Sequence, residues 1–165
     1  MVKSILTHKK SQVWGFDLII GVTIFAVGIL IFFIYSLNKP GEAEESIKKL
    51  SYNGNLVSES VLSEGYPENW NSANVIVPGI LTGNKINNTK LEELYLLADS
   101  DYTKTKSLFN IRENYYILLS EKITLSFGEV DGIGLEPMNP KNLIKINRFT
   151  IYNDKPVNLY IYIWE

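Results

Sequence analysis

An uncharged run of 18 residues, at positions 18–35, constrains the fold of this chain more than any other feature. Before Tyr35, Thr23 has the only side chain in the run with hydrogen-bonding groups. As an α-helix the run would be about 27 Å long, close to the roughly 30 Å hydrocarbon core of a bilayer. A single segment in lipid satisfies its backbone hydrogen bonds only as a helix. The run therefore predicts one membrane-inserted helix.

The residues around this run predict how the helix is oriented in the membrane and that it is not removed as a signal peptide. Lys3, His8, Lys9 and Lys10 precede it, and the positive-inside rule keeps such a basic leader in the cytoplasm. The run is longer than the 7–15-residue apolar region of a secretory signal peptide, and no small-x-small cleavage site follows it. We therefore expect a cytoplasmic leader at 1–11, a transmembrane helix at 12–38 and an extracytoplasmic domain at 39–165.

Composition narrows the functions open to the domain at 39–165. About 125 residues are enough for one small domain with its own core. The formal net charge of -2 gives no reason to expect a nucleic-acid partner, which would need a basic face. The sequence has no cysteine, and its one histidine, His8, lies in the leader. Disulfides, thiolate metal sites and histidine-based catalysis are therefore excluded for this domain.

The motifs that would carry catalysis or cofactor binding are incomplete. Asp99-x-Asp101-x-Thr103 resembles the start of a calcium loop, but Lys104 stands where that loop needs glycine. Residues 79–85 are one residue short of a phosphate-binding loop and lack its final Ser or Thr. We therefore expect no enzymatic activity, no cofactor and no metal site.

The leader and the apolar run together carry a family resemblance. Lys9-Lys10-Ser11-Gln12, followed by Asp17 and then the apolar run, resembles the class III signal of type IV pilin-like proteins, the archaeal members above all. The resemblance implies that a prepilin peptidase cuts between Ser11 and Gln12 on the cytoplasmic side. It also implies that the helix is retained and becomes the core of a filament.

Two further residues are candidate sites outside the leader. Asp17 lies at the membrane boundary, where the first turn of a helix favours a negative charge through the helix dipole. Alternatively, Asp17 pairs with the free amino terminus of a neighbouring subunit during assembly, and both roles remain open. Asn87-Asn88-Thr89 is an N-glycosylation sequon that the expected topology places outside the cell, so Asn87 is a candidate glycan site.

Periodicity and capping residues predict helices beyond the membrane. An apolar stripe begins at Ile47, and Asn53-Gly54 lies inside it, so two helical pieces are expected in place of one. Asn88-Thr89 caps an amphipathic helix of about ten residues. The expected segments are 42–52, 55–64, the ten residues that follow the cap, and 102–109.

Strand-forming residues are concentrated in the last third of the chain. The final run alternates, with Val157, Leu159, Ile161 and Ile163 on the face expected to meet a helix. Its aromatic face is expected to meet solvent or a neighbouring subunit. Residues 153–156 are expected as a four-residue hairpin connection. The expected strands are 75–77, 115–119, 123–127, 144–152 and 157–164, with a loop at 128–140.

These features predict an α+β, pilin-like protein: a long N-terminal transmembrane helix, then a small extracytoplasmic domain of short helices and a C-terminal antiparallel β-sheet. The function expected is that of a structural subunit, major or minor, of a type IV pilus-like surface filament, processed by a prepilin peptidase. The alternative is a permanently membrane-anchored binding domain that does not polymerise. The expected partners are membrane lipid, further copies or other pilin-like subunits, and the prepilin peptidase.

Overall fold

Helix α1 (His8–Leu37) contains the apolar run and extends beyond both of its ends. The computed structural model describes residues 8–37 and 41–165, with side chains for 15–37, 41 and 43–165. The chain divides into two units, Met1–Gly41 and Glu42–Glu165. Within α1, the 23 residues Gly15–Leu37 are long and apolar enough to cross a membrane, and none of them is buried by the rest of the chain. The prediction of one long apolar helix in this part of the chain is thus confirmed, and the helix includes residues 8–11 as well.

Helix α2 (Glu42–Val61) opens the second unit as one uninterrupted helix. The prediction of two pieces, 42–52 and 55–64, is therefore wrong. Asn53 and Gly54 are both buried, because the helix lays this side against the sheet. The apolar positions Leu50, Val57 and Val61 share that side and are fully buried. Packing of this face against the sheet outweighs the poor helix propensity of glycine, which costs about 1 kcal/mol relative to alanine.

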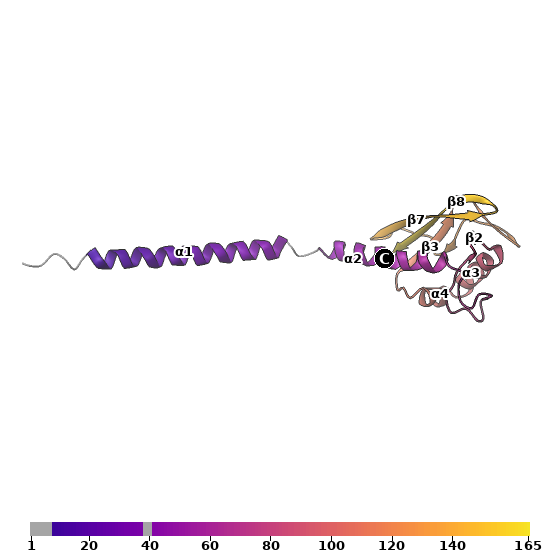
Figure 1. Ribbon diagram of the computed structural model, residues 1–165, viewed down its shortest axis with the longest axis horizontal. Helices are drawn as coiled ribbons and strands as arrows, with labels where there is room; N and C mark the ends of the chain where they lie inside the picture. Colours follow the sequence, from indigo (N-terminus) through magenta and orange to yellow (C-terminus); the bar gives the residue numbers. More distant parts are fainter. Residues whose placement is uncertain (1–7, 38–40) are drawn as a thin grey trace, which may run out of the picture. The chain divides into compact units, whose positions relative to one another are not determined.

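The sheet beside α2 has six strands in the order β1-β2-β7-β8-β3-β6, and its centre is an antiparallel hairpin (Figure 1). The long strands β7 and β8 pair along their whole length, and β3 pairs with the other side of β8. The edge strand pair β1 and β2 joins β7 through one parallel pairing, Lys85 with Ile151. The bounds are β1 (Leu81–Thr82), β2 (Lys85–Ile86), β3 (Asn114–Leu119), β6 (Ile133–Gly134), β7 (Leu143–Tyr152) and β8 (Lys155–Trp164).

The aliphatic face of β8 is buried as its sequence predicts, but Trp164 at the end of the aromatic face is buried within the chain as well. Val157, Leu159, Ile161 and Ile163 are buried in the core on the face that α2 covers. The opposite face carries half-buried Tyr160 and Tyr162 beside Lys145 of β7, with which Tyr162 is paired. The Lys145 ammonium lies 3.8 Å from the Tyr160 ring centroid and 5.5 Å from that of Tyr162. Cation–π contacts of this kind stabilise an open aromatic face.

Helices α3 (Asn88–Ser100) and α4 (Tyr102–Leu108) follow each other in the predicted order, and one residue lies between them. The cap of α3 is Asn87, one residue before the predicted Asn88-Thr89. Asp101 ends α3 and caps α4, because its carboxylate accepts a hydrogen bond from the Lys104 backbone N–H. An acidic residue of the calcium-like motif is therefore in use as a helix cap.

The predicted strands and turns need three corrections. Residues 75–77 are not a strand, since only an isolated bridge joins Tyr66 to Val77. The predicted loop 128–140 contains β5 (Gly128–Val130) and β6, and β5 pairs with β4 (Ile123–Leu125) in a separate two-stranded sheet. The β7–β8 connection has two residues rather than four: Asn153 and Asp154 have φ values of 49° and 61°, and residues 152 and 155 are already paired. Positive φ at both positions is typical of a type I′ turn, which suits the twist of a hairpin.

Candidate functional site

The four candidate processing residues, Lys9-Lys10-Ser11-Gln12, lie within the first turns of α1, where the structure describes the backbone only. Asp17 is exposed in the same helix. Asp17 lies nine residues after His8, the first described residue of α1. A cut before Gln12 would leave a helix that starts closer to Asp17, so both roles of Asp17 stay predictions.

Asn87, the candidate glycan site, belongs to the second unit and has a structural role there. Its side-chain oxygen accepts hydrogen bonds from the backbone N–H groups of Thr89 and Lys90, at 2.9 and 3.2 Å. Its amide nitrogen donates to the Thr82 hydroxyl at 3.0 Å. The sequon asparagine thus caps α3 and ties the start of that helix to the β1 strand.

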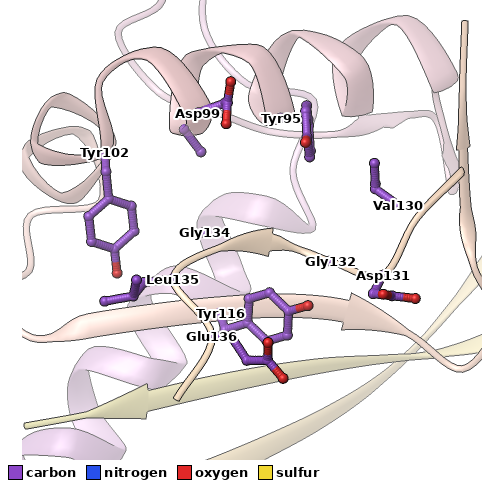
Figure 2. A pocket seen from close by; sticks show the side chains of 11 residues that line it. Tyr95, Asp99, Tyr102, Tyr116, Val130, Asp131, Gly132, Gly134, Leu135 and Glu136 are labelled. Atoms are coloured by element: carbon purple, nitrogen blue, oxygen red, sulfur yellow. The ribbon is translucent and has the colours of Figure 1, made fainter. Parts of the chain in front are cut away.

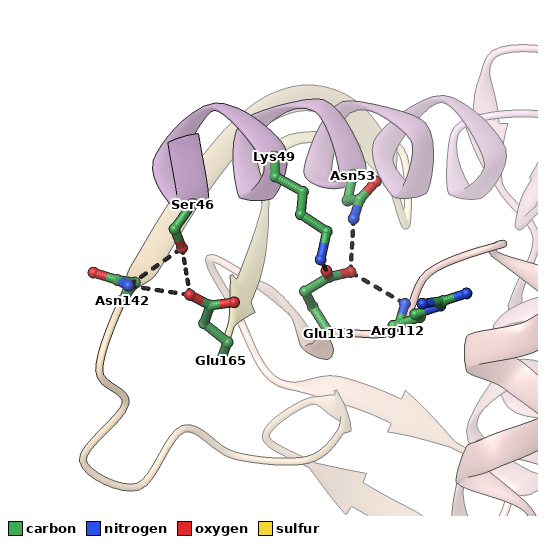
Figure 3. A network of polar contacts seen from close by, with 7 residues as sticks. All are labelled: Ser46, Lys49, Asn53, Arg112, Glu113, Asn142 and Glu165. Carbon is green, nitrogen blue, oxygen red and sulfur yellow. Dashed lines mark hydrogen bonds and ion pairs between the residues drawn. The ribbon is translucent and has the colours of Figure 1, made fainter. Parts of the chain in front are cut away.

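A polar network that sequence reasoning did not find fastens α2 to the sheet (Figure 3). The Glu113 side chain is only 3% exposed, and one of its carboxylate oxygens lies 2.7 Å from the Lys49 ammonium. The other oxygen accepts hydrogen bonds from the Asn53 amide, at 2.6 Å, and from the Arg112 backbone N–H, at 3.1 Å. The carboxylate is therefore satisfied by three donors, two of which α2 supplies.

The environment of Glu113 fixes its charge state. Burial alone would raise the pKa of the Glu113 carboxyl, but the hydrogen bonds from Lys49, the backbone and Asn53 outweigh burial and hold the pKa below its ordinary value. The hydrogen bond and the charge of Glu113 in turn raise the pKa of the Lys49 ammonium. Both groups are therefore ionised at neutral pH, and the pair serves as a fastening within the fold.

Glu165 makes a second set of polar contacts with α2, nearer to the start of that helix (Figure 3). The Glu165 carboxylate accepts hydrogen bonds from the Ser46 hydroxyl and, at 3.1 Å, from the Asn142 amide. The Asn142 amide also donates to the Ser46 hydroxyl at 3.2 Å. These hydrogen bonds lower the pKa of Glu165. Together the contacts hold the first turns of α2 against the end of β8.

A cavity of the second unit lies elsewhere, between α3, β3 and residues 130–136 (Figure 2). Its volume is about 560 Å³, and it opens to solvent. Three tyrosines and three carboxylates line it from different elements, while Ala98, Val130 and Leu135 add apolar surface. Those six residues are Tyr95, Tyr102, Tyr116, Asp99, Asp131 and Glu136, and we call this cavity the tyrosine–carboxylate pocket.

Two of the pocket tyrosines are held in place by the backbone and sheet beside them. The Tyr102 hydroxyl accepts a hydrogen bond from the Tyr115 backbone N–H, at 2.7 Å, and donates to the Tyr115 carbonyl, at 3.1 Å. The Tyr116 ring lies against Gly132, where an added Cβ would come within 2.5 Å of the ring. Glycine at this position therefore allows the backbone of residues 130–136 to approach β3.

Burial favours the neutral form of two pocket phenols, Tyr102 and Tyr116. It raises the pKa of Tyr102 despite the hydrogen bonds to Tyr115 and Leu135 backbone groups. Burial also raises the pKa of Tyr116, and the nearby charges of Glu136 and Asp131 raise it further. A negative charge on the Tyr116 hydroxyl is therefore disfavoured, whereas a positive charge in the pocket would be favoured by the same carboxylates.

The pocket is negatively charged because carboxylates line it, but these carboxylates do not converge on one point. Across residues 8–37 and 41–165, no group of three or more His, Asp or Glu side chains is close enough to hold a metal ion. The lining described above contains no lysine, arginine or histidine. The sequence signal that could have indicated this pocket is Asp131-Gly132-Ile133-Gly134, an acidic residue with two glycines that permit a close backbone approach.

Comparisons with known proteins leave the function to be argued from the residues themselves. The chain matches no protein-family model, and no curated protein sequence and no solved structure is significantly similar to it.

Proposed function

We propose that this protein is a structural subunit of a type IV pilus-like surface filament, anchored in the membrane by α1 before assembly. The observation that carries the proposal is the complete exposure of an uncharged helical stretch, residues 18–35. A helix that is apolar on all sides requires an apolar environment, either lipid or the core of a helical assembly. The chain itself buries no part of Gly15–Leu37, so that environment has to come from lipid or from other molecules.

Small residues on α1 support contacts with other helices. Gly21 and Gly28 are seven residues apart and therefore share one face of the helix. A Cβ added at either glycine would meet no atom within 4 Å, so the described part of the chain does not require glycine there. Small residues on one face let neighbouring helices approach closely. A bundle of α1 helices from several subunits would use such a face.

The layout of the second unit is compatible with the same proposal. Helix α2 lies along the sheet whose centre is the antiparallel β3, β7 and β8 group. An apolar helix, followed by a helix on an antiparallel sheet, is the layout that the class III leader resemblance implies. The proposed partners are membrane lipid, further copies or other pilin-like subunits, and a prepilin peptidase acting at Ser11 and Gln12.

The amino terminus of the protein in native membranes tests this proposal. We expect intact-mass measurement to find a chain that starts at Gln12, together with surface filaments that contain the protein in electron micrographs. A chain that starts at Met1 and remains monomeric would overturn the proposal. It would favour instead a permanently anchored binding domain, a reading to which the tyrosine–carboxylate pocket gives specific support.

Asp17 offers a test of assembly that is separate from processing. Asp17→Asn removes the one charge within the membrane-competent stretch, and the proposal expects normal cleavage but fewer or no filaments. Thr23→Val is a suitable control, because the Thr23 hydroxyl donates to the Ile19 carbonyl of its own helix at 2.8 Å. Equal filament yields from the two variants would exclude an assembly role for Asp17.

A further inference from the structure

We propose that the tyrosine–carboxylate pocket binds an organic ammonium ion. The inference goes beyond the proposed filament function and does not depend on it. It rests on three properties of one cavity: its negative charge, its aromatic walls and the spacing of its carboxylates. Figure 2 shows these groups around the opening, with Tyr95 and Asp99 on α3, Tyr102 on α4 and Tyr116 on β3.

The charge of the pocket favours a cation and disfavours an anion. Asp99, Asp131 and Glu136 line it, and in the described part of the chain none of them forms an ion pair. Elsewhere in the second unit, carboxylates such as Glu113 and Asp154 have a lysine partner. Asp131 and Glu136 also line a neighbouring hollow with Lys122, which forms its ion pair with another carboxylate. Carboxylates without a paired cation create a negative potential that raises the local concentration of positive ligands.

The walls of the pocket favour a cation with an organic surface. A ring face attracts an ammonium group within about 6 Å of its centroid, and the attraction grows when water is excluded. Tyrosines from three elements line this one cavity. One of them, Tyr102, stacks on the Tyr115 ring, and the Lys106 ammonium lies 5.8 Å from the Tyr102 ring centroid. The same chain shows the interaction on its open sheet face, where the Lys145 ammonium lies 3.8 Å from the Tyr160 ring centroid.

The spacing of the carboxylates favours an organic cation over a metal ion as the ligand. Calcium needs six to eight oxygen ligands at 2.3–2.6 Å, all converging on one point. The pocket carboxylates belong to no such convergent group among the described residues. An alkylated ammonium spreads its charge over a larger surface, so separated carboxylates around it are effective. The volume of about 560 Å³ lies within the range of small-molecule sites.

The affinity of the full-length chain for tetramethylammonium tests the proposal. Isothermal titration in an uncharged detergent, at constant ionic strength, should give saturable binding in the millimolar range. tert-Butanol has a similar shape without the charge, so it should give no saturable binding at the same concentrations. Saturable binding of tert-butanol with equal affinity would overturn the proposal, and so would a lack of binding by every ammonium tested.

Variants assign the binding to this pocket. Asp131→Asn combined with Glu136→Gln should weaken tetramethylammonium binding about tenfold, because each partly solvated charge contributes modestly. Both side chains are exposed, so the fold should persist, and circular dichroism checks this. The matched control is Glu59→Gln combined with Glu68→Gln, which removes two exposed charges outside the pocket. Equal affinity of the two double variants would overturn the assignment.

A further variant tests the contribution of an aromatic ring to ammonium binding. Tyr116→Leu keeps an apolar side chain on β3 and removes the ring that lies nearest to Gly132. We expect about a twofold to fivefold loss of affinity for tetramethylammonium, as for a single cation–π contact at a site open to solvent. An unchanged affinity in a folded variant would contradict the aromatic part of the proposal.

An ammonium group can reach the pocket as a free amine or as a lysine side chain of another chain. Titration with butylammonium and with Nα-acetyllysine methylamide distinguishes the two sources. Tighter binding of butylammonium assigns the pocket to free amines, and tighter binding of the lysine derivative assigns it to a peptide-borne lysine. Either result supports an ammonium site, and neither depends on whether the protein forms filaments.

Discussion

Gly54 of α2 lies directly against Ile146 of β7, so closely that a Cβ on Gly54 would come within 2.5 Å of the Ile146 Cδ1 atom. The same Cβ would lie 3.3 Å from the Cγ1 atom of Ile163 on β8. Glycine therefore lies inside a 20-residue helix where the side chains of Ile146 and Ile163 contact the helix backbone. The close approach is the reason that Asn53-Gly54 does not break α2.

Gly54→Ala should destabilise the second unit by about 1 kcal/mol, although alanine is the better helix former. The added methyl group overpacks the contact with Ile146, which costs about 1–3 kcal/mol of stability. The higher helix propensity of alanine offsets about 1 kcal/mol of that cost. The measurement is urea unfolding of the full-length chain in an uncharged detergent, followed by tryptophan fluorescence, to which buried Trp70 contributes.

The companion variant Ile146→Val isolates the cause of that loss. Valine lacks the Cδ1 atom that Gly54→Ala would strike, so the double variant should be more stable than the sum of the two single effects predicts. A coupling of at least about 0.5 kcal/mol is expected for residues in contact. Simple additivity of the two effects would mean that alanine is accommodated elsewhere and that the contact is not the reason for glycine.

Glu113→Gln should lower the free energy of unfolding by about 2 kcal/mol at pH 7. A neutral amide keeps the shape but weakens the bonds from Asn53 and Arg112 and loses the charge-assisted bond to Lys49, each worth about 1–3 kcal/mol when buried. The control is Glu44→Gln on the same helix, which breaks an exposed ion pair with Lys48. That loss should stay below about 0.5 kcal/mol.

The contribution of Glu113 should also depend on pH in a defined direction. Because its pKa is lower in the folded chain, the stabilisation is fully present above the unfolded pKa of about 4.3 and is lost as pH falls through the folded value. The gap in unfolding free energy between wild type and Glu113→Gln should therefore be constant from pH 7 to about pH 5 and narrow below about pH 4. A gap that widened on acidification would contradict the direction of this shift.

Local patterns in the sequence were enough for the elements whose packing follows from their own periodicity. The uncharged run of α1 and the alternation of β8 both specify a face or an environment without reference to distant residues. The membrane-competent helix, the aliphatic face of β8 and the order of α3 and α4 were predicted correctly for this reason. The α+β class follows from the same elements.

The failures of prediction share a different cause, which is contact between residues far apart in the chain. Asn53-Gly54 was interpreted as a helix breaker, because its partners Ile146, Ile163 and Glu113 lie 60 or more positions away. The tyrosine–carboxylate pocket brings together residues from 95 to 136, and no local spacing joins them. The hairpin was predicted too long because residues 155 and 156 extend β8, which the turn residues alone did not reveal.

At the β7–β8 turn, Asp154→Gly should be more stable than Asp154→Ala by about 1 kcal/mol. Both variants lose the exposed ion pair with Lys85, so only the backbone preference differs between them. Asp154 has a φ of 61°, where a Cβ costs about 1–2 kcal/mol and glycine has no such cost. At exposed Glu59 inside α2, the same two substitutions should have the opposite order of stability. Equal stability of the two Asp154 variants would show that the turn relaxes out of its positive φ.

Lys90 is a buried lysine whose ammonium serves two backbone carbonyls, so Lys90→Met should cost about 2 kcal/mol. The residue is 7% exposed, and its Nζ atom donates to the carbonyls of Glu64, at 2.8 Å, and Leu81, at 2.9 Å. A cation in the first turn of α3 is disfavoured by the helix dipole, by a few tenths of a kcal/mol, which the two hydrogen bonds exceed.

The control for Lys90 is Lys104, a half-buried lysine whose hydrogen bond to a backbone carbonyl is open to solvent. Lys104 donates to the Ser72 carbonyl at 2.9 Å, and water can replace it there, so Lys104→Met should change stability by less than about 0.5 kcal/mol. Urea unfolding of both variants in the full-length chain measures the difference. Losses of equal size would mean that burial of the carbonyls of Glu64 and Leu81 is not what makes Lys90 necessary.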